Sequence, residues 1–333
     1  MTMHCIIHRD DDPFFNLAME EVLFGRSSET GDGYIILWRN RPTVVVGRFQ
    51  NAAGEVNPPF LREKGVAVVR RTTGGGAVYH DLGNLNYTFI LPVGDRDSRG
   101  LDFALYTKPL LEYLDSIGVK AELTGRNDLT IEGKKFSGNA QHVSKNTMLH
   151  HGTIMFDSCL EDVAASLSVD PEKFKSKGVA SVRSRVTNVA PHLPNPMPME
   201  DFIEGLMSHF AAPFGGSARS LDDDEVREIS EMRDSKYATW DWVWGSSPPF
   251  SLSSERRFEK GKVQVYLDVR EGTIEDVAIR GDFFSVADPS DLENALRGVR
   301  FDRKAVSEIL SSLPVGKYIL GVTAEELTDL VVD

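Results

Sequence analysis

Apolar residues recur along this chain with two spacings, and each spacing predicts its own kind of element. Alternating or β-branched runs bounded by turn residues predict strands at 34–38, 44–47, 66–69, 85–91, 150–156, 263–269 and 274–279. Helical periodicity predicts helices at 12–25, 102–117, 199–210, 289–296 and 303–313, the first of them ending at Gly25. The acidic run 222–225 is expected to begin one more helix.

These elements divide the chain unequally. Its 333 residues exceed the usual size of one domain. Three of the four tryptophans fall within 240–244, just before the proline-bearing stretch 246–250, where they form either a core patch or a seam at a domain boundary. We predict a large domain over 1–245, a linker over 246–250, and a small domain, a β-hairpin with helices, over 251–333.

Composition narrows the classes of partner. A hydrophobic content of 41% and a charged content of 26% are typical of a folded globular protein. The net charge of −13 argues against a general nucleic-acid or anionic-membrane surface. No stretch approaches a membrane span, the first residues lack a signal-peptide pattern, and Cys5 and Cys159 form no metal or redox motif. We therefore expect a cytoplasmic protein whose partners are small molecules or proteins.

A glycine-rich segment follows the strand at 66–69. It begins with Arg70 and Arg71 and continues through Gly74, Gly75 and Gly76. Without Cβ atoms, the backbone N–H groups can close on an anion, and arginine adds forked donors that suit phosphate or carboxylate. The segment matches neither the P-loop nor the dinucleotide fingerprint, and a turn with two solvated arginines would have the same pattern.

A hairpin is expected over 125–140. The pair Glu132-Gly133 lies between strand-like flanks and would aim Lys135 back at the sheet. His150 and His151 are adjacent on the next strand, so they point to opposite faces, and no cysteine or third histidine lies near them in sequence. A zinc site is therefore not expected.

In this order, the segments 70–84, 125–129, 134–140, 150–153 and 181–188 resemble the lipoate-protein ligases, as do 16–18, 47–51 and 240–242. The resemblance covers nearly the whole chain. It implies an α/β (α+β) catalytic domain like that of biotin protein ligases and class II aminoacyl-tRNA synthetases, with a small C-terminal accessory α+β domain. Fold alone would not give the substrate.

The resemblance also implies a two-step reaction. Lipoate and ATP give lipoyl-adenylate with release of pyrophosphate, and the lipoyl group then passes to a lysine of a lipoyl-domain protein. The implied carriers are the acyltransferase subunits of 2-oxoacid dehydrogenases and the glycine-cleavage carrier protein. Bringing a carboxylate to a phosphate demands that two anions be neutralised and aligned, a task that the arginines and Lys135 suit.

Site residues carry over from the resemblance position by position. Lys135 is the implied catalytic residue, a point charge touching both the ATP phosphate and the lipoate carboxyl. The implied ATP contacts are Arg71, Gly76, Ala77, Val78, Tyr79 and Lys135. The implied lipoate contacts are Lys135, Gly75, Gly76, Arg71, His151 and Ser137. The implied adenylate-binding loop contains Gly178, Ser181, Val182 and Arg183, and Asp128 with Asn127 could supply oxygen ligands to Mg²⁺.

Two related activities stay open at this point. One is a lipoyltransferase that accepts preformed lipoyl-adenylate. The other is a thiol-dependent octanoyl or lipoyl transferase, for which Cys159 is the candidate nucleophile. Acidic residues surround Cys159 in sequence, and they disfavour a thiolate. Release of pyrophosphate from lipoate and ATP without a carrier would separate the ligase from both.

Overall fold

The computed structural model describes residues 1–93, 102–144, 146–167, 185–245, 252–270 and 272–332. The chain forms two compact units. The first contains Met1–Val45, Gly54–Arg70 and Val78–Val243, and the second contains Val46–Ala53, Arg71–Ala77 and Trp244–Asp333. Part of the glycine-rich segment therefore groups with the C-terminal part of the chain. Among the described residues, no helix is long and apolar enough to cross a membrane.

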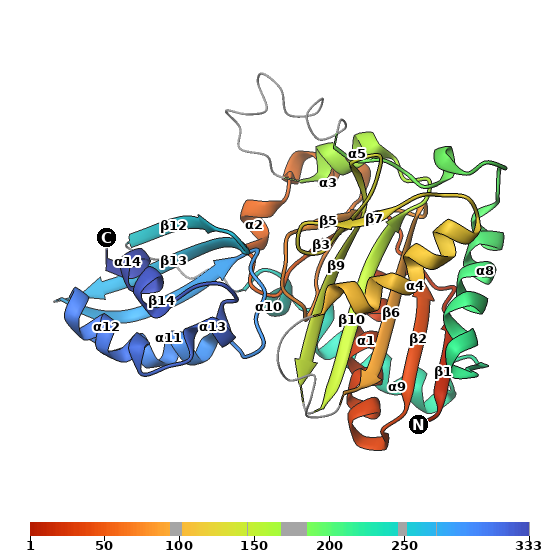
Figure 1. Cartoon of the computed structure of the whole chain (residues 1–333). Helices are drawn as coiled ribbons and strands as arrows, with labels where there is room; N and C mark the ends of the chain where they lie inside the picture. Colours follow the sequence, from red (N-terminus) through yellow and green to blue (C-terminus); the bar gives the residue numbers. More distant parts are fainter. Residues whose placement is uncertain (94–101, 145, 168–184, 246–251, 271, 333) are drawn as a thin grey trace. The chain divides into compact units, whose positions relative to one another are not determined.

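An eight-stranded sheet forms the centre of the first unit (Figure 1). Its strand order is β11-β1-β2-β6-β10-β9-β8-β7. The central strands pair antiparallel, and successive side chains along each strand point to opposite faces. The strands are β1 (Met3–Ile7), β2 (Gly33–Trp38), β6 (Asn84–Pro92), β7 (Glu122–Thr124), β8 (Asp128–Ile131), β9 (Lys134–Ser144), β10 (Thr147–Met155) and β11 (Ser217–Ala218).

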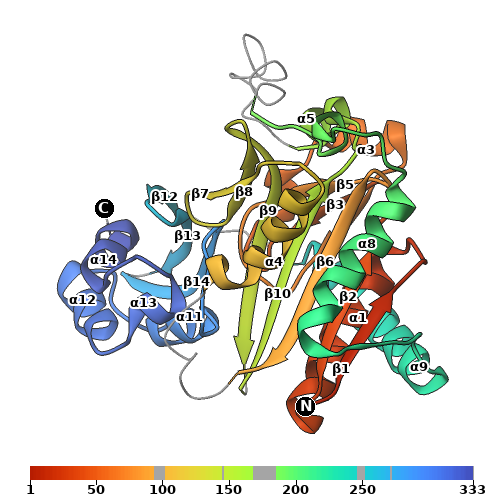
Figure 2. The ribbon, with the colours of Figure 1, turned by 45° about the vertical axis from the view of Figure 1, so that its right-hand side comes forward.

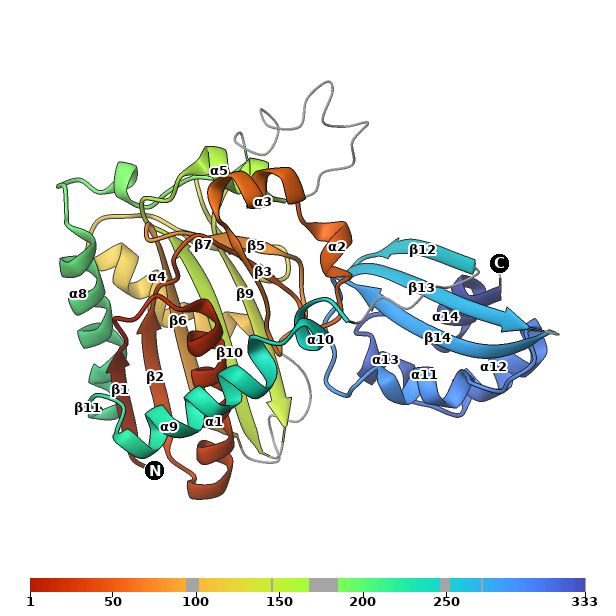
Figure 3. The same ribbon diagram turned by 180° about the vertical axis from the view of Figure 1, so that it is seen from behind.

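Helices cover both faces of this sheet. Helices α4 (Phe103–Ser116) and α8 (Met199–Ala211) lie on one face, as Figures 1 and 2 show. Helices α1 (Pro13–Thr30) and α9 (Asp223–Met232) lie on the other, which Figure 3 shows from behind. Each face has its own apolar core because alternate residues of the strands point to opposite sides.

The start of α1 was predicted correctly, but its end was not. Asp12 caps the N-terminus by accepting from the Phe14 N–H, and Pro13 occupies the first helical position. The predicted end at Gly25 is wrong, because α1 continues to Thr30. The helix ends at Gly31, whose φ of 76° is the left-handed conformation that glycine adopts without strain.

A second, three-stranded sheet has the order β4-β3-β5. Its strands are β3 (Thr43–Val46), β4 (Ala67–Arg70) and β5 (Val78–His80), so the glycine-rich segment connects β4 to β5. The remaining elements of this part of the chain are short. They are α2 (Ala52–Glu55), α3 (Pro58–Lys64), α5 (Leu160–Ser166), η1 (Ala190–His192), η2 (Ala212–Phe214), η3 (Arg233–Tyr237) and α10 (Trp240–Val243).

In the described residues of the C-terminal part of the second unit, from 252 on, there is a three-stranded antiparallel sheet, β12-β13-β14, and four helices. The predicted hairpin is present as β13 (Gly261–Arg270) and β14 (Thr273–Gly281). Helices α11 (Ser290–Leu296) and α12 (Arg303–Ser311) were predicted, whereas α13 (Val315–Tyr318) and α14 (Ala324–Val332) were not. Strand β12 (Leu252–Phe258) was also missed, because it is a largely exposed edge strand without apolar alternation.

Candidate active site

Strand register gathers several polar residues on the α1 face of the large sheet. Asn86 of β6 is paired with Thr153 of β10, and Thr88 is paired with His151. His151 is paired in turn with Ala140 of β9. Residues paired directly across antiparallel strands point to the same face. Polar side chains from β6 and β10 therefore line one surface that continues across β9.

A bulge in the β8–β9 hairpin sets the direction of Lys135. The turn at Glu132 and Gly133 has φ values of 51° and 73°, as the predicted two-residue hairpin requires. Leu129 pairs with Ser137, but the next pair is Thr130 with Lys135, so Phe136 is an extra residue. The bulge places Lys135 on the same face as Gly138 and its partner Asp128, which a regular strand would not do.

The ammonium of Lys135 lies over Gly138 and forms a partly exposed ion pair. Its Nζ is 2.8 Å from Oδ1 of Asp128, and the two side chains are 37% and 39% exposed. A Cβ on Gly138 would lie only 3.0 Å from this Nζ, so glycine gives the ammonium its space. An ion pair this exposed contributes little to stability, which leaves the charge available to an anionic ligand. Lys134, by contrast, is exposed and pairs with Ile131, whose side chain lies in the opposite core.

The oxygen ligands considered for Mg²⁺ differ in their surroundings. The carboxylate of Asp128 pairs with Lys135 and stays partly exposed. The amide of Asn127 donates to the Asn139 carbonyl at 2.5 Å, and its oxygen accepts from Nε of Arg126 at 3.3 Å. Among the described residues there is no cluster of three acidic, histidine or cysteine side chains. This donor set fits only an ion held through one carboxylate and substrate phosphates, as Mg²⁺ often is.

A buried hydrogen-bond chain orients His151. Its Nδ1 lies 2.9 Å from one Glu20 oxygen and 3.0 Å from the other. Glu20 accepts from the Thr88 hydroxyl at 2.6 Å, and that hydroxyl accepts from the Trp38 indole at 3.0 Å. Sequence analysis missed Glu20. The available signal was an acid on the apolar stripe of the first helix, where Glu20 is 2% exposed.

Ser137 and His150 lie on the other face of the sheet. The Ser137 hydroxyl accepts from Asn139 at 3.3 Å, and Asn139 accepts from the Tyr87 hydroxyl at 2.5 Å. The side chain of Ser137 is therefore not gathered with those of Lys135 and His151. His150 is bonded to Gln141 and Tyr87, and burial, with the neighbouring His151, lowers the pKa of His150 well below its usual range.

Arg71 is wrapped by its own loop within the second unit. Its Nη2 donates to the carbonyls of Gly74 and Gly76, both at 2.8 Å, and its Nε donates to Oγ1 of Thr73 at 3.0 Å. Arg71 is only 6% exposed. Its guanidinium therefore fixes the shape of the segment that carries Gly75 and Gly76.

The glycines of this loop have a packing role that sequence did not predict. The Gly75 N–H donates to the Phe283 carbonyl at 3.2 Å, and Gly75 has a φ of 93°. A Cβ on Gly74 would collide with that same carbonyl oxygen. The loop continues with Ala77, which is partly exposed. Close packing on another backbone segment, as well as room for an anion, accounts for glycine at these positions.

The remaining predicted contacts lie on β5 or outside the described residues. Val78 packs on the apolar core of the α1 face, and burial, followed by the charge of Asp162, raises the pKa of Tyr79. Gly178, Ser181, Val182 and Arg183 lie outside the described part of the chain, as does the predicted linker. Just after them, the Arg185 carbonyl accepts from the Lys135 N–H at 2.8 Å, and the Thr187 N–H donates to the Lys135 carbonyl at 2.9 Å.

Cys159 lacks the surroundings of a nucleophile. It precedes α5, and its Sγ lies 3.7 Å from a Glu161 oxygen. The backbone N–H of Asp162 favours the thiolate, but burial and the charge of Asp162 outweigh it, so the pKa of Cys159 is raised. A catalytic thiol needs the opposite shift. The cysteine-dependent transferase is therefore not favoured.

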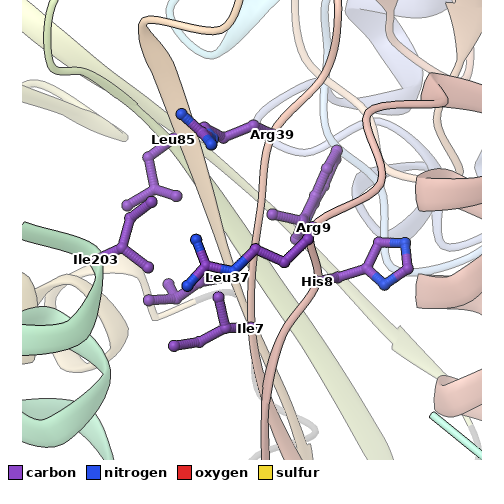
Figure 4. Close-up of a pocket in the computed structure, with 8 residues that line it drawn as sticks. Ile7, His8, Arg9, Leu37, Arg39, Leu85 and Ile203 are labelled. Atoms are coloured by element: carbon purple, nitrogen blue, oxygen red, sulfur yellow. The ribbon is translucent and has the colours of Figure 1, made fainter. Parts of the chain in front are cut away.

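A small pocket elsewhere in the first unit does not compete with this site (Figure 4). Its volume of about 10 Å³ suits roughly one water molecule. Ile7, Leu37, Leu85 and Ile203 give it apolar walls. His8 and Trp38 also line it, and the two arginines of the lining, Arg9 and Arg39, both pair with Glu200.

Two family models match most of the chain. Residues 12–211 match the family model of the lipoyl protein ligase A/B catalytic domain, and 247–331 match that of the bacterial lipoate protein ligase C-terminus. The chain belongs to the lipoate-protein ligases. Lipoate-protein ligase LplJ of Bacillus subtilis is 39% identical over 324 residues, which cover 96% of this chain and 97% of that relative.

Solved structures share the fold of this ligase. LipL1 of P. falciparum in complex with lipoate superposes with a TM-score of 0.79 at 25% identity, over 93% of this chain and 94% of that one. A bipartite lipoate protein ligase of Thermoplasma acidophilum, studied with its E2 lipoyl domain, superposes with a TM-score of 0.67 at 27% identity, over 76% and 100%. The expected α/β catalytic fold with a C-terminal accessory domain is confirmed.

Proposed function

We propose that this enzyme is an ATP-dependent lipoate-protein ligase that makes lipoyl-adenylate and transfers the lipoyl group to protein lysines. The observation that carries the proposal is Lys135, which a bulge turns onto the polar face of the sheet, where its one ion-pair partner among the described residues is the exposed carboxylate of Asp128. Family membership and the ligand named for LipL1 support lipoate as the acyl substrate.

In the first step, a carboxylate oxygen of lipoate bonds to the α-phosphorus of ATP. The bond from that phosphorus to the bridging oxygen breaks, and pyrophosphate leaves with the electron pair. Lys135 exchanges Asp128 for the two reacting anions and reduces their repulsion, an electrostatic role that needs no nucleophile. Mg²⁺, when bound, would supply further charge neutralisation, and Asp128 would hold it.

The other predicted contacts are assigned to the two substrates as part of this proposal. Arg71 shapes the loop that presents Gly75, Gly76 and Ala77 to ATP, and Val78 and Tyr79 extend that contact. His151, oriented by Glu20, contacts lipoate on the sheet surface. Ser137 contributes through its backbone, since its side chain faces the other core. Gly178, Ser181, Val182 and Arg183 bind the adenylate.

In the second step, the neutral amine of a carrier lysine attacks the acyl carbon. The bond from that carbon to the AMP oxygen breaks, AMP leaves with the electron pair, and the new amide nitrogen releases a proton to solvent. The carriers are lipoyl-domain proteins, namely acyltransferase subunits of 2-oxoacid dehydrogenases and the glycine-cleavage carrier. The lipoyl domain paired with the Thermoplasma ligase supports this class. We place catalysis in 1–245, the linker at 246–250, an accessory role in 251–333, and the enzyme in the cytoplasm.

Pyrophosphate release tests this proposal. The purified protein is incubated with ATP, Mg²⁺ and lipoate, without any carrier, and pyrophosphate is measured. We expect release that depends on lipoate, followed by lipoylation when a lipoyl domain is added. Lipoylation of the domain from synthetic lipoyl-adenylate, without pyrophosphate release from ATP and lipoate, would instead identify a transferase.

A further inference from the structure

Two asparagines on β6 form a buried pair whose polar atoms are only half used. Asn84 and Asn86 alternate with core residues, so both point to the face that carries Lys135. Nδ2 of Asn84 donates to Oδ1 of Asn86 at 3.1 Å. The residues are 0% and 2% exposed. Within the described part of the chain, Oδ1 of Asn84 and Nδ2 of Asn86 have no hydrogen-bond partner.

This pattern does not depend on how the amides are oriented. If both amides are flipped, the bond runs from Asn86 to Asn84, and one donor and one acceptor are again left over. A buried polar atom without a partner destabilises a protein, and most such atoms in native structures are paired. Two of them side by side, complementary in character, call for a partner that offers one acceptor beside one donor, which either a buried water molecule or a ligand supplies.

The pair lies close to the reacting groups. Asn86 is opposite Thr153, whose hydroxyl accepts from the Gly138 N–H at 3.1 Å. Gly138 is the residue over which the Lys135 ammonium lies. Asn86, Thr153 and Gly138 thus follow one another across β6, β10 and β9. In the chain, β6 follows β5, where two of the proposed ATP contacts lie. The turn between these strands is closed by a hydrogen bond from the Asn84 N–H to the Asp81 carbonyl, at 3.0 Å.

The hydrogen-bonding groups of lipoate and ATP indicate which of the two substrates the asparagine pair binds. The carboxylate of lipoate offers only acceptors. Adenine offers the 6-amino donor next to a ring-nitrogen acceptor, the arrangement that an asparagine amide reads when it binds adenine. We propose that Asn84 and Asn86 are specificity-determining residues that hydrogen-bond the adenine edge of ATP and of the adenylate. This inference rests on the proposed ligase function.

The unpaired atoms are buried in the free protein, so binding of the base to them requires that the neighbouring groups move apart. Binding would then pair both atoms at once. The free protein is destabilised by these two buried, unpaired atoms, and the bound nucleotide removes this destabilisation by pairing them. This predicts that apolar replacements of similar shape do not destabilise the free protein, while they abolish its selection of the base.

The experiment compares ATP with purine riboside triphosphate, which lacks the 6-amino group, in the pyrophosphate assay. We expect wild-type protein to favour ATP at least about tenfold in kcat/KM, the effect of one lost hydrogen bond in a buried site. In the double variant Asn84→Leu/Asn86→Leu the ratio should approach one. The KM for lipoate should change by less than about threefold, since the acyl group makes no contact with the pair.

Thermal unfolding of the same variants supplies a second measurement. The double variant should unfold at the wild-type temperature or above it. Gln141→Leu is the matched control, because Gln141 lies on the opposite face and bonds His150 at 2.9 Å and the Asp102 carbonyl at 2.9 Å. It should lower the unfolding temperature and leave base selection intact. If the double leucine variant does not fold, the expectation that the pair is unfavourable in the free protein is wrong, and Asn86→Ser is used for the base comparison.

Three outcomes would overturn the inference. These are retention of base selection by the folded asparagine variants, a raised KM for lipoate with unchanged base selection, and wild-type indifference to the 6-amino group. Absence of pyrophosphate release from wild-type protein with ATP would instead contradict the ligase function itself. The two failures are therefore distinguishable.

Discussion

The β8–β9 hairpin and the glycine-rich loop each carry a cation assigned to the same phosphate chemistry, and they hold it in opposite ways. Within the described residues Lys135 has one carboxylate partner, at 2.8 Å, and its side chain is 37% exposed. Arg71 is 6% exposed and donates to two carbonyls and a hydroxyl of its own loop. One cation is within reach of solvent and the other is enclosed by backbone.

Under the proposed function, this difference separates a cation that binds substrate from one that shapes the binding surface. Exchanging Asp128 for a phosphate replaces one partly solvated ion pair with another, so little is lost. Freeing Arg71 would leave buried carbonyls without donors, which is unfavourable. We infer that Lys135 acts on the reacting anions directly, and that Arg71 acts chiefly through the shape it gives to the loop.

The largest expected effect is that of Lys135→Ala. Adenylate formation should fall at least about a hundredfold, because the two reacting anions lose their preorganised counter-charge. The unfolding temperature should hardly change, since the ion pair is exposed. Pyrophosphate release and thermal unfolding measure the two effects. Lys134→Ala is the matched control and should keep near-normal activity; a folded Lys135→Ala protein with similar activity would refute the assignment.

Arg71→Lys should affect stability more, and catalysis less, than Lys135→Ala does. Lysine keeps the charge but cannot reach two carbonyls and a hydroxyl with a planar fork. We expect a loss of about 1–3 kcal/mol in unfolding free energy and roughly a tenfold rise in the KM for ATP. Denaturant titration and steady-state kinetics test both. Full stability together with lost activity would mean that Arg71 contacts ATP in the way Lys135 does.

Gly75→Ala tests the loop shape without touching a charge. The new Cβ would lie 3.0 Å from Nη2 of Arg71 and 3.2 Å from the Phe284 ring, at a φ of 93°. We expect about 1 kcal/mol of destabilisation and a few-fold rise in the KM for ATP. Gly65→Ala is the control, since its φ is 64° and its Cβ would meet nothing within 4 Å. An unchanged KM in Gly75→Ala would argue against loop shape as the means by which Arg71 acts.

The same contrast explains what could be predicted from the sequence. The hairpin was predictable because Glu132 and Gly133 form a local turn signal, and the helix over 199–210 because Phe202, Leu206 and Phe210 share one face. The bulge at Phe136 has no local signature, although it decides where Lys135 points. The packing of Gly74 and Gly75 against Phe283 joins segments far apart in sequence. The role of Glu20 likewise depends on its contact with His151, which the sequence does not show.

Asp128→Asn should have the smallest effect. It removes the charge of the carboxylate that pairs with Lys135. Because the pair is partly solvated, its loss should change the unfolding free energy by less than about 1 kcal/mol. An amide is a weaker Mg²⁺ ligand than a carboxylate, so the Mg²⁺ concentration that gives half-maximal pyrophosphate release should rise several-fold. At saturating Mg²⁺ the activity should approach that of wild type, since Lys135 keeps its charge. An unchanged Mg²⁺ midpoint would mean that Asp128 does not bind Mg²⁺ and only pairs with Lys135 in the free enzyme. A loss of activity as large as that of Lys135→Ala would mean instead that the ammonium depends on Asp128 for its position.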